Sequence, residues 1–252
     1  MSFGFFCWYD LYTDRLDDAK SFYGELFGWT YRTDTSGETP YHIINDTHCD
    51  TGGMCTVPEA PPVWQTYVTV EDIDGTIETA KAHGGALIHG PFDAKGVGRM
   101  ALMTDPEGAH IWGIQLNTPM PEPPGIPKHG QFCWRTLMTR DLKPALAFYN
   151  AVFGWTAQTM DAGGGVSTTG FMNEGMPVGG VNVADPNDPT PSHWAVAIAT
   201  DDINATLAKA SELGATTVVP VMPIGEMGLF CVVQDPVGAH VSFWQQLAPP
   251  SA

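Results

Sequence analysis

Basic residues are scarce in this chain of 252 residues, which has 11 lysines and arginines against 28 aspartates and glutamates. The formal net charge is -17 at pH 7. Proteins that bind nucleic acid, or that adsorb to anionic membranes, need clustered lysine and arginine side chains. The few scattered basic residues therefore exclude both classes. We expect the acidic surface either simply to keep the protein in solution or to attract cationic ligands.

Paired cysteines are also absent: the chain has five cysteines and no CxxC motif. An odd number without paired spacing argues against a disulfide framework and favours a reducing, cytoplasmic location. The first residues, "MSFGFFCWYDLYTD", lack the basic region of a signal peptide, and no apolar run is long enough to cross a bilayer. We therefore expect a soluble cytoplasmic protein.

Several catalytic sequence motifs are missing as well. The sequence contains no P-loop, no dinucleotide-binding glycine fingerprint and no GxSxG nucleophile elbow. The glycine run in "DAGGGVSTTG" (161–170) does not precede a helical pattern and is typical of a hairpin loop. The function must therefore be sought in another kind of site.

An internal repeat is the strongest positive feature of the sequence. "SFYGELFGW" (21–29) returns as "AFYNAVFGW" (147–155), and "GFFCWYDL" (4–11) returns as "GQFCWRTL" (130–137). "DPEGAHIW" (105–112) returns as "DPVGAHVS" (235–242). Repeats of this kind indicate duplicated structural units. The sequence thus predicts two homologous domains, 1–118 and 128–252, joined by a proline-rich, semi-rigid linker over 119–127.

Each half contains the same order of elements twice. Alternating apolar residues in "FCWYDLY" predict a strand, and Asp14 is the expected cap of a helix with Ala19, Phe22, Tyr23 and Leu26 on one face. Gly28 suits the left-handed position that ends this helix. Short strands follow, and "WQTYVTV", a helix capped by Asp72 and a "DPEG" turn repeat the pattern. The helical phrase "FY..LFGW" is therefore interpreted as a packing unit.

This order, with "FY..LFGW" on the first helix and "DPxG" before the last strand, resembles the vicinal oxygen chelate superfamily, which includes glyoxalase I, bleomycin-resistance proteins and extradiol dioxygenases. The resemblance covers nearly the whole chain and most resembles tandem two-domain glyoxalase-like proteins. It implies an α+β fold of two tandem domains, each a pair of βαβββ modules that form a curled, half-open barrel around a cavity.

The resemblance also implies where a divalent metal would bind, because family members draw His and Glu ligands from the first and last strands of their modules. In this chain those positions fall on Trp8 and Trp112 in the first half and on Trp134 and Ser242 in the second. The strand that opens the second module offers Gln65 in one half and Ala195 in the other. Neither half retains the usual His/Glu set, so no cofactor is expected, although a divalent metal at a non-standard site stays open.

Asp10 and His110 are the candidate catalytic residues. Strand alternation places Trp8, Asp10 and Tyr12 on one face and His110 with Trp112 on another. If both faces line the cavity, the Asp10 carboxylate and the His110 imidazole could bind a metal or act as an acid–base pair. The alternative is that His110 and His240 only form hydrogen bonds near their turns.

Ligand-binding residues are expected on the same strand faces. The candidates are Trp8, Gln65, Trp112, Trp134, His240 and Ser242. Aromatic walls with a few polar groups suit a flat or amphipathic small molecule. Either large Trp side chains fill the barrels or they line a pocket. Ala195, Ala197 and Ala199 share one strand face, which predicts a roomier cavity in the second half.

Two functions remain open at this point. One is a metal-free protein that binds an aromatic or amphipathic metabolite or drug. The other is an enzyme of glyoxalase-like descent, a lyase, isomerase or oxygenase, that uses Asp10 and His110. One half could also be a purely structural partner. Because the two halves could pair internally, the chain is expected to be a monomer or a homodimer.

Overall fold

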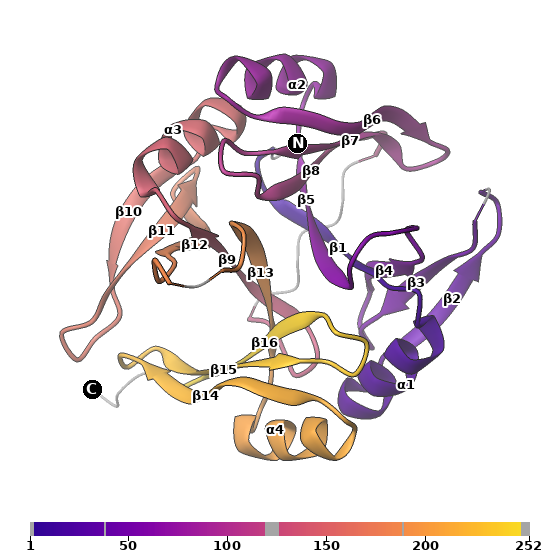
Figure 1. The fold of residues 1–252 in the computed structure, drawn as a ribbon, viewed down its shortest axis with the longest axis vertical. Helices are drawn as coiled ribbons and strands as arrows, with labels where there is room; N and C mark the ends of the chain where they lie inside the picture. The colour runs from indigo at the N-terminus through magenta and orange to yellow at the C-terminus, as the bar shows by residue number, and fades with distance from the viewer. Residues whose placement is uncertain (1–2, 38, 119–125, 188, 248–252) are drawn as a thin grey trace.

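Two curled β-sheets, one from each half of the chain, form the centre of the molecule (Figure 1). The computed structural model describes residues 3–37, 39–118, 126–187 and 189–247. The strand order is β2-β3-β4-β1-β5-β8-β7-β6 in the first sheet and β10-β11-β12-β9-β13-β16-β15-β14 in the second. The two orders correspond strand for strand, so the sequence repeat is a repeat of structure.

The first half contains two βαβββ modules. The elements of the first module are β1 (Phe6–Tyr12), α1 (Leu16–Phe27), β2 (Thr30–Asp34), β3 (Tyr41–Asn45) and β4 (Asp50–Cys55). Those of the second module are β5 (Val63–Thr69), α2 (Ile73–Ala82), β6 (Ala86–Ala94), β7 (Gly98–Thr104) and β8 (His110–Leu116). The two modules join where β1 pairs with β5 in antiparallel fashion.

The second half repeats this arrangement. Its first module contains β9 (Phe132–Thr139), α3 (Leu142–Phe153), β10 (Thr156–Asp161), β11 (Ser167–Asn173) and β12 (Met176–Val183). Its second module contains β13 (His193–Ala199), α4 (Ile203–Glu212), β14 (Thr216–Ile224), β15 (Gly228–Gln234) and β16 (His240–Gln246). The predicted α+β fold of paired βαβββ modules is confirmed. Most of the predicted linker, 119–125, lies outside the described residues.

Most of the predicted helix ends are found. Asp72 caps α2 by accepting a hydrogen bond from the Asp74 amide, and Gly28 takes the left-handed conformation (φ 73°) that ends α1. The prediction for the start of α1 was wrong: Arg15 occupies the cap position, and no side chain caps the helix. The Arg15 side chain instead pairs with Asp18, and its guanidinium donates to the Pro236 carbonyl of the other half.

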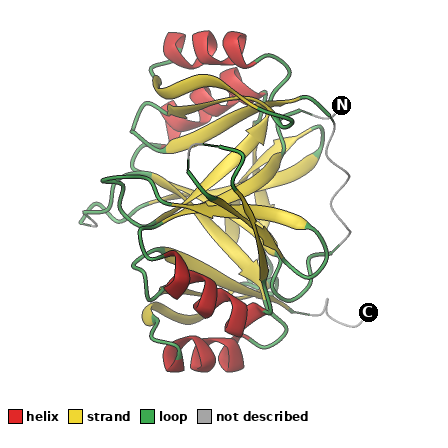
Figure 2. Cartoon of the chain, turned by 90° about the vertical axis from the view of Figure 1, so that its right-hand side faces the viewer, coloured by secondary structure: helices red, strands yellow, loops and turns green. Residues whose placement is uncertain are grey.

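Helices cover the ends of the molecule, with the strands between them (Figure 2). α1 lies beside α4 and α2 lies beside α3, so each helix pair combines one helix from each half (Figure 1). The two large buried clusters follow the same division. One contains Phe22 with Val196, Ile198 and Phe243, and the other contains Ile73 with Phe148. The halves therefore share their cores.

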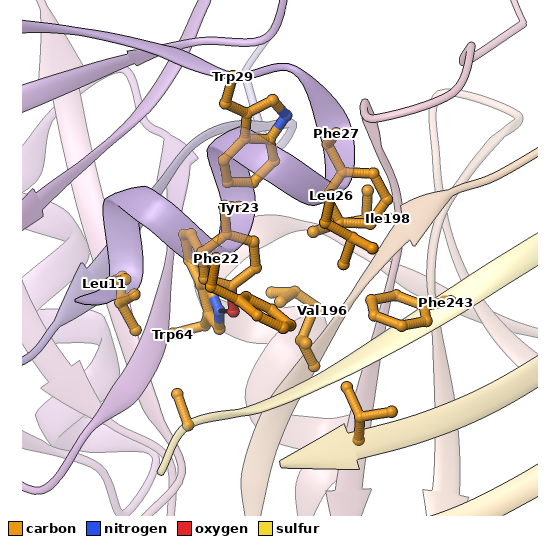
Figure 3. Close-up of a cluster of buried hydrophobic side chains, with 14 of the residues drawn as sticks. Leu11, Phe22, Tyr23, Leu26, Phe27, Trp29, Trp64, Val196, Ile198 and Phe243 are labelled. Atoms are coloured by element: carbon orange, nitrogen blue, oxygen red, sulfur yellow. Dashed lines mark hydrogen bonds between the residues drawn. The ribbon is translucent and has the colours of Figure 1, made fainter. Parts of the chain in front are cut away.

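The repeated phrase lies at this shared core. The Tyr23 hydroxyl donates to Asp235 Oδ2 of the other half at 2.8 Å and accepts from Trp64 Nε1 at 3.0 Å. Figure 3 shows Leu26 and Phe27 of α1 facing Ile198 and Phe243. These contacts explain why the phrase and the "DPxG" turn are repeated together.

The counterparts in the second half repeat these contacts. The Tyr149 hydroxyl donates to Asp105 Oδ2 at 3.2 Å and accepts from Trp194 Nε1 at 2.8 Å. The two tryptophans that end the phrases also bond across the halves: Trp29 Nε1 to the Gly130 carbonyl at 2.7 Å, and Trp155 Nε1 to the Gly4 carbonyl at 2.8 Å. The phrase therefore joins the two halves, beyond the apolar packing expected of it.

Candidate functional site: two concave faces

The concave faces of the two sheets are built from matching strand positions. In the first half Asp10 pairs with Gly53 on one side and with Gln65 on the other. In the second half Thr136 pairs in the same way with Gly180 and Ala195. Tyr67 lies beside Trp112, and the matching neighbours are Ala197 and Ser242. The same register therefore carries different side chains in the two halves.

In the first half these side chains surround a buried carboxylate. Asp10 Oδ1 accepts hydrogen bonds from Trp8 Nε1 at 3.0 Å and from the Tyr41 hydroxyl at 2.5 Å. Asp10 Oδ2 accepts from the Tyr67 hydroxyl at 2.7 Å. Asp10 itself is only 4% exposed. Buried charges need such partners, and no cation is among these three donors.

Aromatic rings close the rest of this face. The Tyr67 and Trp112 rings stack with their centroids 5.2 Å apart and an interplanar angle of 8°. Trp112 Nε1 donates to the Tyr12 hydroxyl at 3.0 Å. We call the set Trp8, Asp10, Tyr12, Tyr41, Tyr67 and Trp112 the first-half plug. Its polar groups bond to one another, and Asp10, Tyr12, Tyr67 and Trp112 are all buried.

Burial sets the ionisation of the plug. Loss of hydration raises the pKa of Asp10, and the hydrogen bonds from Tyr41, Tyr67 and Trp8 offset only part of this effect. The pKa of Tyr41 is raised first by its burial and then by the nearby Asp10 charge. The tyrosines therefore keep their protons and act as donors to Asp10.

The second half has smaller side chains at most plug positions, and Met138 stands at the place of Tyr12. Thr136 stands at the place of Asp10, Ala197 at that of Tyr67, and Ser242 at that of Trp112. On β11, Thr168 takes the position that Tyr41 has on β3, because Gly170 and Ile43 pair with matching glycines. Only the tryptophan is kept, as Trp134.

A cavity of about 1810 Å³ results, and most of its wall comes from the second half. We call it the second-half hollow. Alternate residues of four adjacent strands make up much of the wall, as expected for one face of a sheet. Among the lining residues are Trp134, Thr136 and Met138 on β9, Ala195, Ala197 and Ala199 on β13, Phe230 and Val232 on β15, and Ser242 and Trp244 on β16. The roomier cavity expected from the alanine row is present.

The predicted site residues divide between these two regions. Trp134, His240 and Ser242 line the hollow, and so do Gln65 and His110 from the first half. Trp8, Asp10 and Trp112 belong to the plug instead. Within the described residues, side-chain hydrogen bonds to Asp10 come from Trp8, Tyr41 and Tyr67, and none from His110. The acid–base role of Asp10 and His110 stays a prediction.

Tyr41 and Tyr67 were not predicted as site residues, although both donate hydrogen bonds to the Asp10 carboxylate. Strand alternation could have identified Tyr67, since it shares a face of β5 with Gln65. Tyr41 could not be assigned without the β3–β4 register. Gly53 gives a further clue, because a methyl group there would lie 2.1 Å from the Tyr41 hydroxyl oxygen.

The positions that the resemblance assigns to metal ligands carry other residue types in this chain. In the first half they are Trp8, Gln65 and Trp112, and in the second Trp134, Ala195 and Ser242. Indole rings and an alanine offer no ligand atoms, and the amide oxygen of Gln65 and the hydroxyl of Ser242 are weaker ligands than imidazole, carboxylate or thiolate groups. Within the described residues, no group of three or more His, Cys, Asp or Glu side chains could hold a metal ion.

The duplicated βαβββ pairs and the cavity on a curled sheet define a vicinal-oxygen-chelate type of protein. The chain belongs to the Glyoxalase/Bleomycin resistance protein/Dioxygenase superfamily, whose family model matches residues 6–112 and 131–243. Members of this superfamily bind small-molecule substrates or ligands. No helix in the described part of the chain is long and apolar enough to span a membrane.

Three known proteins illustrate the relationship. The Mycobacterium tuberculosis protein CFP32, provisionally named a glyoxylase, is 33% identical over 93% of this chain and 92% of its own length. The anthracycline biosynthesis protein DauV of Streptomyces sp. strain C5 is 30% identical over 82% of this chain and 81% of its own. The Mn(II)-bound glyoxalase of Novosphingobium aromaticivorans has a TM-score of 0.62 at 13% identity, covering 98% of this chain and 83% of its own. This last likeness shows the fold alone.

Proposed function

We propose that this protein binds an aromatic or amphipathic small molecule in the second-half hollow without a metal ion. The observation that carries the proposal is the difference between the halves: matching positions hold a plug in one and a cavity in the other. A cavity walled by Trp134, Phe230 and Trp244 suits a flat apolar ligand. The similarity to DauV, named an anthracycline biosynthesis protein, agrees with an aromatic ligand.

The side chains that line the hollow, and the hydrogen bonds that surround Asp10, favour ligand binding over catalysis. The hollow is lined by Met138, Met160 and Met227, whose flexible thioethers adapt to different ligand shapes. It lacks the ligand set with which family members activate a substrate by metal coordination. In the plug, the three hydrogen bonds to Asp10 occupy the carboxylate that the enzyme alternative would use.

A substitution that places a tyrosine in the hollow, as in the first half, tests this proposal. Ala197→Tyr places a tyrosine at the position of Tyr67, and Ala86→Tyr on the exposed start of β6 is the matched control. Binding of 9-fluorenone, a flat three-ring ketone, is followed by isothermal titration calorimetry. We expect binding to the parent and to Ala86→Tyr, and at least tenfold weaker binding to Ala197→Tyr. Equal binding by all three proteins would contradict the proposal.

Metal content separates the proposal from the enzyme alternative. The protein is purified without chelator or affinity histidines and measured by elemental mass spectrometry. We expect substoichiometric iron, manganese, nickel and zinc. Near-stoichiometric metal that disappears in Asp10→Asn or His110→Gln would favour a glyoxalase-like lyase or oxygenase.

A further inference from the structure

The first-half plug is an internal template for the ligand of the second half. In the plug, the indole N–H of Trp8 donates to two acceptor oxygens, Asp10 Oδ1 at 3.0 Å and the Tyr41 hydroxyl at 2.6 Å. Beside these oxygens, the Tyr67 and Trp112 rings lie parallel on the concave face. The plug is therefore a set of flat rings gathered around one carboxylate, whose Oδ1 accepts from a tryptophan.

The second half keeps the tryptophan donor and lacks both the acceptor carboxylate and the two stacked rings. Trp134 lies at the position of Trp8, and its side chain lines the hollow. Among the described residues, no protein group accepts a hydrogen bond from Trp134 Nε1, because Thr136 is shorter than Asp10 and carries no carboxylate. The rings are missing too, since Ala197 and Ser242 replace Tyr67 and Trp112.

Two further polar groups face the same space. The Thr136 and Ser242 hydroxyls line the hollow, and neither has a hydrogen-bond partner within the part of the chain that the structure describes. A methyl group at Gly180 would lie 3.1 Å from Trp134 Nε1 and 3.4 Å from Thr136 Oγ1. The indole N–H and the Thr136 hydroxyl thus meet beside Gly180, where a ligand oxygen would find both.

We infer, on the basis of the proposed function, that the ligand is a fused-ring aromatic compound bearing a carbonyl or phenolic oxygen that accepts a hydrogen bond from Trp134 Nε1. The ligand rings take the space that Tyr67 and Trp112 fill in the first half. The ligand oxygen takes the part of Asp10 Oδ1. A ring system without an acceptor binds more weakly, because it buries the indole donor unpaired.

A matched pair of probes tests the inference. 9-Fluorenone and fluorene have the same three-ring framework, and only the ketone carries an acceptor. The parent protein should bind 9-fluorenone roughly five- to tenfold more tightly than fluorene, the usual effect of one hydrogen bond. Trp134→Phe should lower this preference to about onefold with fluorene affinity little changed, whereas Trp244→Phe, also in the wall, should keep it.

Infrared difference spectra add a readout that does not depend on any variant folding. On binding to the parent, the carbonyl stretch of 9-fluorenone should move to lower frequency, as for a ketone that accepts a hydrogen bond. Equal affinity of the parent for both probes, an unshifted carbonyl band, or a preference that survives Trp134→Phe would overturn the inference and leave the proposed function standing. If neither probe binds the parent, both proposals fall.

Discussion

The two halves of this protein share one scaffold and differ in what occupies its concave face. Both use matching strand orders, helix pairs and hydrogen bonds between the repeated phrase and the "DPxG" turn. On the concave face, Asp10 and Tyr67 lie in a buried plug, and their counterparts Thr136 and Ala197 border a cavity. A duplicated fold can therefore keep its core in both copies while the side chains on the two concave faces diverge.

The largest loss of stability is expected from replacing a core phenylalanine that both halves share. Phe22 and Phe148 are 2% and 1% exposed, at the same place on α1 and α3. Replacing either with alanine should lower the free energy of unfolding by about 3–5 kcal/mol, through lost burial and the cavity left behind. Urea denaturation checks this. If either variant unfolds like the parent and instead loses probe binding, the phrase has a functional role and this comparison is wrong.

A smaller loss of stability is expected from substitutions on the concave faces, where the two halves differ. Asp10→Ala removes an acceptor from one buried donor, Tyr67, and two half-buried donors, Trp8 and Tyr41, so we expect a loss of about 2–3 kcal/mol in the free energy of unfolding. The matched change Thr136→Ala removes a hydroxyl that faces the hollow and should cost less than about 1 kcal/mol. Urea denaturation of both variants and the parent at pH 7 would measure these losses. Similar losses in the two halves would show that the second concave face is as tightly packed as the first.

The smallest effect is a dependence on pH. Burial raises the pKa of Asp10 above its ordinary value of 3.8, so the folded state holds this proton more tightly than the unfolded state does. That contribution to stability is fully present below the unfolded pKa and is lost as pH rises through the folded pKa. The parent should therefore lose stability relative to Asp10→Asn as pH rises above 3.8. A constant difference across a pH series of urea titrations would contradict the assigned shift.

The sequence repeat predicts much of this architecture. The order of elements, the two halves, the Asp72 cap and the Gly28 helix end follow from local patterns. The start of α1 does not, since Arg15 stands at the cap position and also donates to the Pro236 carbonyl of the other half. The hydroxyl of Tyr23 is a similar case. Its partner Asp235 lies more than two hundred residues away.

The candidate site could be predicted only in part. Strand alternation identifies the faces that carry Trp134 and Ser242, and the alanine row on β13 indicates a cavity. Alternation does not tell which face residues touch one another. His110 borders the second-half hollow, whereas the side chains that reach Asp10 come from β1, β3 and β5. Cross-strand register and side-chain length determine which side chains reach Asp10. The contact of Tyr41 with Asp10 follows from these two features and not from strand alternation. The cytoplasmic location and the oligomeric state stay predictions.

A crystal structure of the parent protein soaked with 9-fluorenone is the most direct test of ligand binding in the second-half hollow. We predict density for one flat molecule in the second-half hollow, with its ketone oxygen beside Trp134 Nε1, and an unchanged plug around Asp10 in the first half. A molecule that displaces Tyr67 and Trp112 from the first half, with the second-half hollow left without it, would contradict the account.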